Sequence, residues 1–169
     1  MRMPILFLSC ALAWPGSAFP ADPSAGAVFE QLKSFAGHWR SADPARATRV
    51  EFESIANGST LVETWTMSPT RQSMTVYTMD GDRLLATHYC PQGNAPRLKY
   101  ARTDASGAHH FEFLDGANLQ DPGGSHAHAF WVREDDGGAI TRGETYISNS
   151  ARYDPAKDAA STERFTRVR

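Results

Sequence analysis

Most of the chain alternates apolar and polar residues with the period of two that is typical of β-strands. From Gly37 onward, short segments rich in Val, Thr, Tyr, Phe and Trp are separated by clusters of Gly, Asp, Asn and Pro. Neighbouring side chains of a strand point to opposite faces, and such clusters form turns, so this pattern indicates successive antiparallel strands. The predicted strands cover residues 37–41, 47–54, 60–67, 73–79, 83–90, 97–103, 109–114, 126–134, 139–147 and 161–168.

The connections between these segments suit tight hairpins, because their residues tolerate positive φ. Examples are Asn57-Gly58, Asp80-Gly81-Asp82 and the segment 135–138. No long helical crossover separates the strands, and a meander of about ten strands removes its exposed edges by closing on itself. We therefore predict an all-β fold, a closed antiparallel up-and-down barrel of about ten strands.

One segment ahead of the strands has a helical period instead. Val28, Phe29, Leu32 and Phe35 recur at spacings that place them along one stripe of a helix. A serine precedes this segment and a glycine follows it, as is usual at helix ends. The sequence therefore predicts one short N-terminal helix over residues 25–35.

The first residues have the order of a secretory signal peptide. Arg2 precedes a mostly apolar run over residues 4–14, and small residues follow it. The run is shorter than the ~20 residues that a membrane-spanning helix needs. We expect residues 1–18 to be removed on export, with cleavage after Ala21 as the later alternative. A single domain of residues 19–169 would then remain, periplasmic or secreted.

Charge and cysteine content limit the partners of this domain. The chain has 17 Lys and Arg residues against 19 Asp and Glu residues, a formal net charge of -2. It has no basic stripe and no later apolar segment of membrane-spanning length, so we expect neither nucleic acid binding nor stable membrane insertion after signal cleavage. Cys10 lies in the apolar run and would leave with it, unless it is a lipoprotein acceptor. Cys90 is then the only cysteine, and no intrachain disulfide is expected.

The triplet Gly37-His38-Trp39 follows the predicted helix and opens the first strand. With the strand meander, it resembles the lipocalin superfamily, in which a Gly-x-Trp places the indole across the closed end of the barrel. The resemblance implies structural roles for Gly37 and Trp39. About ten strands make the chain more similar to fatty-acid-binding and nitrobindin-like barrels than to lipocalins. Nitrobindins continue with two further glycines, whereas this chain continues Arg40-Ser41-Ala42, which weighs against haem binding.

A second resemblance is to exported bacterial proteins that carry a Thr-His-Tyr-Cys segment followed by Gly-Asn-x-Pro-Arg. The matching residues here are Thr87-His88-Tyr89-Cys90 and Gly93-Asn94-Ala95-Pro96-Arg97. The match covers only about a dozen residues. That family has no established activity to carry over to this chain.

The first of these two segments predicts a titratable pair at the end of a strand. His88 and Cys90 are two residues apart and share a face, whereas Tyr89 points the other way. If the shared face is the interior, both line the mouth of the barrel and are candidate catalytic residues. Asn94 suits the following turn, and Arg97 could bind an anionic head group or a carboxylate. The alternative is a packed wall with a hydrogen-bonded imidazole and an inert thiol.

Two further sets of polar residues lie within strands. His126 and His128 are also two apart and could share a metal ion, but a site needs a further ligand, which His88 or Cys90 could supply only if their strands lie side by side or across the barrel. The alternative is a solvent-facing pair near a loop. Three carboxylates interrupt otherwise apolar strands, namely Glu63, Glu112 and Glu144. We expect them to form structural salt bridges to Arg97 or Arg142.

The favoured function is an exported barrel that binds a small, partly apolar ligand in its interior. Polar residues would orient the ligand's polar end, namely His88, Tyr89, Asn94 and Arg97. Aromatic residues would form the wall, namely Trp65, Tyr77, Phe111, Phe113, Phe130 and Trp131.

The alternative function is an enzyme or redox protein. It would use a metal or haem held by His88, His126 and His128, or Cys90 as a reactive thiol. No cofactor is firmly implied, and the common hydrolase and nucleotide-binding signatures are absent from the sequence. A packed barrel that acts in protein interaction is a third interpretation, for which the sequence offers no distinctive surface.

Overall fold

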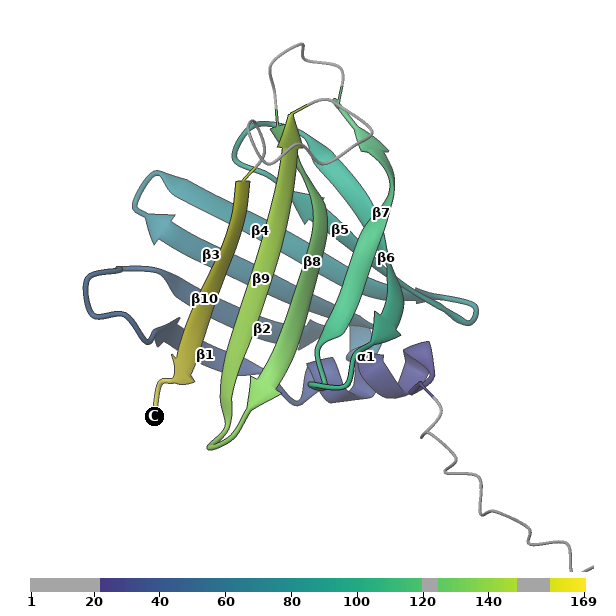
Figure 1. The fold of residues 1–169 in the computed structure, drawn as a ribbon, viewed down its shortest axis with the longest axis horizontal. Helices are drawn as coiled ribbons and strands as arrows, with labels where there is room; N and C mark the ends of the chain where they lie inside the picture. Colours follow the sequence, from purple (N-terminus) through teal and green to yellow (C-terminus); the bar gives the residue numbers. More distant parts are fainter. Residues whose placement is uncertain (1–21, 120–124, 149–158) are drawn as a thin grey trace, which may run out of the picture.

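The computed structural model describes residues 22–119, 125–148 and 159–169. Within these residues, ten strands pair antiparallel with their neighbours in the chain, and the first pairs with the last to close a barrel (Figure 1). This confirms the predicted closed up-and-down barrel with one short N-terminal helix. The expected signal peptide, residues 1–18 with Ala21 as the later cleavage point, lies outside the described residues.

The elements follow the predicted order along the chain. They are α1 (Ala25–Lys33), β1 (Gly37–Ser41), β2 (Arg49–Ile55), the short 3-10 helix η1 (Ala56–Gly58), β3 (Thr60–Ser68), β4 (Arg71–Asp80), β5 (Arg83–Tyr89), β6 (Ala95–Thr103), β7 (His109–Ala117), β8 (Ser125–Asp135), β9 (Ala139–Ser148) and β10 (Ala159–Arg167). None of the helices in the described part of the chain has the length and apolarity needed to cross a membrane.

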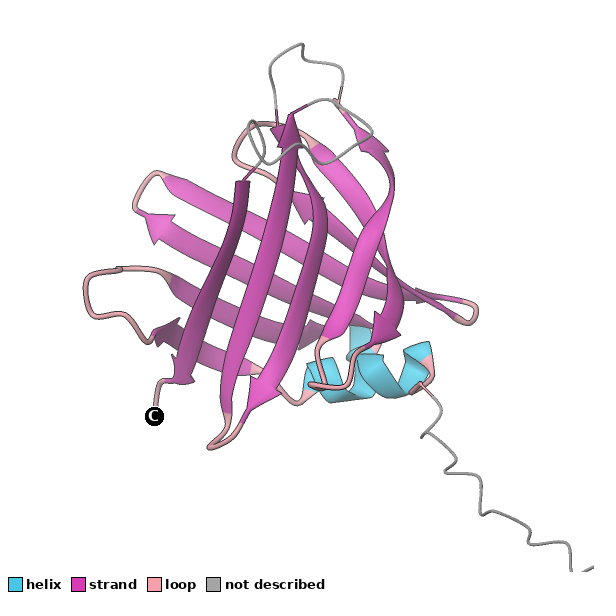
Figure 2. Ribbon diagram, viewed as in Figure 1, coloured by secondary structure: helices cyan, strands magenta, loops and turns pink. Residues whose placement is uncertain are grey.

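Helix α1 covers one end of the barrel (Figure 2). Its N-terminus is capped by Ser24, whose side chain accepts a hydrogen bond from the backbone N–H of Ala27 at 3.2 Å. Val28, Phe29 and Leu32 form the predicted stripe and are buried, and the helix contacts β2, β4 and β5. Burial of each such side chain contributes about 1.5–3 kcal/mol relative to its exposure to water. The stripe therefore fixes the helix against the barrel.

The chain turns from the helix into the barrel through a buried aromatic pair. The helix ends before Phe35, which is buried beside the indole of Trp39 with a ring-centroid distance of 6.3 Å. The indole N–H of Trp39 donates a 2.8 Å hydrogen bond to the backbone carbonyl of Phe35. Gly37, between them, has φ of 125°, a conformation that favours glycine. Trp39 thus lies at the helix-covered end.

The barrel interior divides into an apolar half beside α1 and a polar half at the other end. Because the strands alternate in direction, the polar half lies where the β1–β2, β3–β4 and β5–β6 connections are. The apolar half includes Phe52, Leu61, Tyr77, Leu84, Phe111, Val132, Ile140 and Phe165. The polar half includes Ser41, Thr48, Ser73, Thr75, His88, Glu144 and Tyr146. The polar side chains of the interior are therefore concentrated at the end of the barrel opposite the helix.

Candidate functional site

A buried ion pair lies where the two halves of the interior meet. Glu63 on β3 and Arg142 on β9 are at most 3% exposed, and the guanidinium donates to the carboxylate. Tyr77 on β4 donates a 2.6 Å hydrogen bond to the same carboxylate oxygen of Glu63 and accepts one of 2.9 Å from Arg142. This confirms the expected salt bridge from Glu63 to Arg142. Three strands are joined through these groups inside the barrel.

Aromatic rings enclose this ion pair. The indole N–H of Trp65 donates a 2.7 Å hydrogen bond to the second carboxylate oxygen of Glu63. The guanidinium of Arg142 lies 4.0 Å from the ring centroid of Phe130 and 5.5 Å from that of Trp65. Cations attract the faces of aromatic rings, so these contacts add to the ion pair. Both charges are therefore bonded from several directions, as burial requires.

The protonation of this cluster follows from burial and charge. Burial raises the pKa of the Tyr77 hydroxyl well above its ordinary value, so the group stays a neutral donor. Burial by itself would lower the pKa of Arg142, but the charge of Glu63 and the contact with Tyr77 raise it above its ordinary value. Arg142 therefore remains a cation inside the barrel.

His88 on β5 is buried in the polar half of the interior, and both nitrogens of its ring have hydrogen-bond partners. One ring nitrogen lies 2.9 Å from the hydroxyl of Thr75, and the other lies 3.2 Å from the hydroxyl of Tyr146. Burial, and next the charge of Arg142, lower the pKa of His88 to about 4. The imidazole is therefore neutral at neutral pH and holds the Tyr146 hydroxyl in place.

Glu63, Tyr77, Arg142 and His88 form a buried polar layer across the barrel. Above this layer, a cavity of about 330 Å³ lies at the end of the barrel opposite α1. Its aromatic walls are Trp65 and Tyr146, and Ser73 and Cys90 also line it. Elements far apart in the sequence meet there, from the β1–β2 connection to β10. The cavity is further lined by Arg46, Thr48, Met67, Arg71, Pro91, Gln92, Glu144, Ser161 and Glu163.

The charged side chains of this cavity lie at two depths. Glu144 and Glu163 are 17% and 12% exposed, and they come from β9 and β10. Arg46, on the β1–β2 connection, is 54% exposed, and Arg71 at the start of β4 is also exposed. Carboxylates therefore lie deep in the cavity, and guanidinium groups lie at its rim.

Cys90 faces this cavity without signs of activation. Burial raises the pKa of its thiol, and the hydrogen bonds from the Gln92 backbone and the Tyr146 hydroxyl oppose this only in part. His88 is bonded to Thr75 and Tyr146 instead, and its neutral ring supplies no positive charge to the thiol. A thiol reacts through its thiolate, so this environment favours the inert form.

The structure separates the residues that the sequence grouped together as a predicted ligand-binding set. Trp65 and Cys90 line the cavity, and His88 lies behind its wall, bonded to Tyr146. Asn94 is buried in the β5–β6 connection, where its side-chain amide donates a 2.9 Å hydrogen bond to the backbone carbonyl of Ser125. It thus holds the start of β8 rather than the cavity.

Three residues that were predicted to contact a ligand do not line this cavity, and Arg97 instead has the carboxylate partner that was predicted as its alternative. Tyr89 is 52% exposed on the outer face, because it alternates with the inward-facing His88. Arg97 is also outside and forms a two-pronged ion pair with Asp115 of β7. Phe130 is fully buried, stacks on Phe111 at 4.5 Å and does not line the cavity.

The other predicted aromatic wall residues also have packing roles. Tyr77 and Phe111 belong to the buried core. Trp131 lies on the outer face, where its indole covers Gly143 of β9. The ring of Phe113 contacts those of His126 and His128, with centroid distances of 5.1 and 5.3 Å.

The two histidines of β8 lie close together, with ring centroids 5.8 Å apart. Among residues 22–119, 125–148 and 159–169, no three His, Cys, Asp or Glu side chains are grouped so that they could hold a metal ion. His88 is engaged with Thr75 and Tyr146 rather than with this pair. The described residues therefore offer the predicted metal site no third ligand.

The sequence did not single out several residues that define the cavity. Tyr146 was detectable, because it continues the alternation of Arg142 and Glu144 along β9 and so shares their inward face. Arg46, Arg71 and Glu163 carry no comparable local signal. Arg46 reaches the cavity from the β1–β2 connection, Arg71 from the start of β4, and Glu163 from β10.

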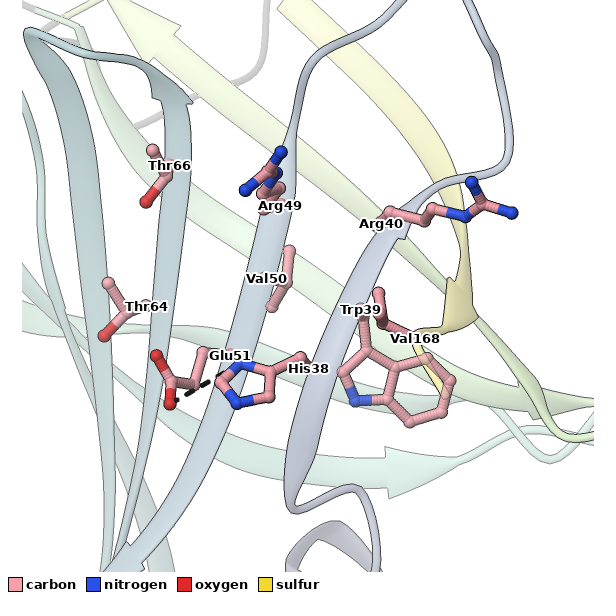
Figure 3. Close-up of a pocket in the computed structure, with 9 residues that line it drawn as sticks. All are labelled: His38, Trp39, Arg40, Arg49, Val50, Glu51, Thr64, Thr66 and Val168. Atoms are coloured by element: carbon pink, nitrogen blue, oxygen red, sulfur yellow. Dashed lines mark ion pairs between the residues drawn. The ribbon is translucent and has the colours of Figure 1, made fainter.

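A second depression, of about 490 Å³, lies on the outer face of β1, β2 and β3 (Figure 3). His38 and Glu51 face each other across it at 3.7 Å, and both side chains are more than half exposed. Arg40 and Arg49 are exposed as well, and Thr64 and Thr66 are half-buried. This face lacks the buried polar groups that would position a ligand, so the cavity at the barrel end is the stronger candidate site.

Comparison with known proteins adds no relative, because no protein-family model and no curated protein matches the chain. The closed ten-stranded antiparallel barrel itself fits a lipocalin-like, or calycin, fold in general.

Proposed function

We propose that this protein is an exported barrel that binds a small, partly apolar molecule in the cavity opposite α1. The observation that carries the proposal is that cavity of about 330 Å³, which has aromatic walls, a few charged groups and a buried polar layer beneath it. Small-molecule sites commonly have volumes of about 300–1,000 Å³ and combine apolar walls with a few placed polar groups. The cavity lies at the small end of this volume range, and its two aromatic residues stand among a larger number of polar and charged side chains.

The ligand would occupy the end of the barrel and not its full depth. Tyr77, Phe111 and Phe130 pack against one another below the cavity, with ring centroids 4.5 to 6.2 Å apart. Since these rings fill the centre, a long lipid chain could not run through the barrel without displacing them. A compact molecule with one ring or a short chain fits this site better.

The buried polar layer prepares the cavity for a ligand. Trp65 is fixed by its hydrogen bond to Glu63, and Tyr146 is fixed by its contact with His88. Side chains that are already ordered lose little conformational entropy when a ligand binds. The two aromatic walls therefore stand in place before binding.

Native mass spectrometry with an ultraviolet-visible spectrum, on mature protein purified after export, tests this proposal. An organic mass that is lost on denaturation is expected. The variant Ser73→Leu adds volume inside the cavity opposite Trp65 and should lower occupancy about ten-fold or more. Its matched control is Gln72→Leu, the same change at the adjacent, exposed position of β4.

Two results would contradict the proposal. One is equal occupancy in the Ser73→Leu and Gln72→Leu variants, because the ligand would then lie elsewhere. The other is an apo mass for the wild-type protein together with no binding of any compound in a small-molecule screen. A metal mass or a haem absorption band would instead support the alternative of a metal- or haem-dependent protein.

A further inference from the structure

The two carboxylates in the cavity are neighbours across one strand pair. In the β9–β10 register, Glu144 lies opposite Ser161 and Glu163 lies opposite Arg142. Glu144 and Glu163 are therefore diagonal neighbours, which lie about 7–8 Å apart in an antiparallel pair. Both line the cavity, so their carboxylates approach the same space.

Their oxygens are only partly used by the protein. Glu144 accepts a 3.1 Å hydrogen bond from Nε of Arg142, and one oxygen of Glu163 accepts a 3.2 Å hydrogen bond from Arg46. The other oxygen of Glu163 is buried and accepts no hydrogen bond from any described residue. A buried acceptor without a donor is costly, and an N–H group of a ligand would remove that cost.

The charges around the cavity also favour a cation. Arg142 forms its buried ion pair with Glu63, so its positive charge is already matched before Glu144 is considered. Arg46 meets Glu163 from the half-exposed rim, where water and salt weaken its field. The deeper part of the cavity thus has two carboxylates beside the rings of Trp65 and Tyr146. Aromatic faces and carboxylates together are the groups that recognise organic ammonium ions.

We propose that the ligand is a small organic amine, bound as its ammonium ion between Glu144 and Glu163 with its apolar part against Trp65. This inference rests on the proposed function, because it names the ligand class of the same cavity. An anionic ligand would have to bind Arg46 and Arg71 at the exposed rim. It would then make no favourable contact with the two carboxylates beneath it. Because the carboxylates lie deeper in the cavity than the guanidinium groups, a cationic ligand fits the cavity better than an anionic one.

Calorimetric titration of the mature protein with three matched probes tests the inference. The probes are 2-phenylethylamine, 2-phenylethanol and phenylacetate, which share a ring and differ in the charge of the head group. The amine should bind about ten-fold more tightly than the alcohol, and phenylacetate should bind most weakly. Higher salt should weaken amine binding more than alcohol binding.

Glu144→Gln and Glu163→Gln test the two carboxylates separately. Each variant keeps the size of the side chain and a hydrogen-bonding oxygen, and should weaken amine binding about ten-fold while weakening alcohol binding much less, because only the amine carries a charge. The control is Glu134→Gln, an exposed carboxylate at the α1 end of β8, which should change neither.

The outcomes separate the inference from the proposed function. If the alcohol or phenylacetate binds as tightly as the amine and Ser73→Leu blocks it, the inference is wrong but the cavity still binds ligands. If the preference for the amine survives both Gln variants, Glu144 and Glu163 do not recognise the cation, and the inference is again wrong. If none of the three probes binds, the amine class is rejected, and the native mass spectrum decides whether the cavity holds another molecule.

Discussion

The guanidinium of Arg142 donates to the carboxylate of Glu63 inside the barrel, although the two residues are 79 positions apart in the chain. The pair ties β9 to β3 beneath the cavity, and Tyr77 joins it from β4. Removing two charges from water costs several kcal/mol, which the attraction and the added hydrogen bonds offset only when the geometry is complete. The pair therefore depends on every member of its cluster.

Arg142→Met is expected to destabilise the fold by about 3–5 kcal/mol, because it leaves the Glu63 carboxylate buried without its counter-ion. The double variant Glu63→Gln with Arg142→Met should lose less, since it removes both charges. Urea unfolding followed by circular dichroism measures the two free energies of unfolding. An equal loss in the single and double variants would show that the isolated charge is not the source of the cost.

The stability of the fold should fall as the pH falls below the ordinary pKa of histidine. The pKa of His88 is lowered from 6.5 to about 4, chiefly by burial. In the unfolded chain the ring takes up a proton below its ordinary pKa, whereas in the folded protein it stays neutral until about pH 4. The unfolded state is therefore favoured as the pH falls through this window, by about 2 kcal/mol between about pH 7 and about pH 5.

His88→Gln isolates this contribution to the pH dependence. Glutamine keeps a donor and an acceptor for Thr75 and Tyr146 but does not titrate. The free energy of unfolding, measured by urea titration across the same pH range, should have a shallower slope in the variant. An unchanged slope would mean that other groups, such as His109, whose pKa is also lowered by burial, account for it.

The sequence predicts the fold well because the relevant signals are local. Alternation along each strand and the turn residues between strands need only neighbouring positions, and the barrel closure follows from avoiding free edges. The same alternation places His88 and Cys90 inward and Tyr89 outward, as observed. The outward direction of Arg97 was also predictable from alternation, because Arg97 lies between Pro96 and Leu98 of β6, which are both buried.

The candidate site was less predictable because it depends on contacts between distant segments. Whether Glu163 approaches Glu144 depends on the register of β10 against β9, and a shift of one residue would turn Glu163 outward. Arg46 reaches the cavity from a loop whose path no short-range pattern specifies. The depth of each charge, on which the ligand class rests, is a property of the closed barrel alone.

Cys90 is expected to react slowly with thiol reagents in the folded protein. Burial raises the pKa of its thiol, so the thiolate population at neutral pH is below that of a free cysteine. Labelling with a disulfide reagent such as DTNB should be at least about ten-fold slower than for an exposed cysteine, and urea should abolish the difference. The matched comparison is Cys90→Ser with Ser106→Cys, which moves the thiol to an exposed turn. If Cys90 is labelled faster than the thiol at position 106, this prediction is wrong and the result supports the hypothesis of a reactive thiol.

Gly143 on β9 lies directly beneath the indole of Trp131, the residue opposite it on β8. A Cβ atom at position 143 would overlap the indole nitrogen of Trp131, so Gly143→Ala must push the ring away from the barrel. The expected cost is about 1–3 kcal/mol in the free energy of unfolding, as for other overpacked positions. In a Trp131→Ala background the same change should be neutral or stabilising, because alanine loses less backbone entropy than glycine on folding. A double-mutant cycle by urea unfolding measures this coupling. The same cost in both backgrounds would place the need for glycine in the backbone of β9 and not in the packing of Trp131.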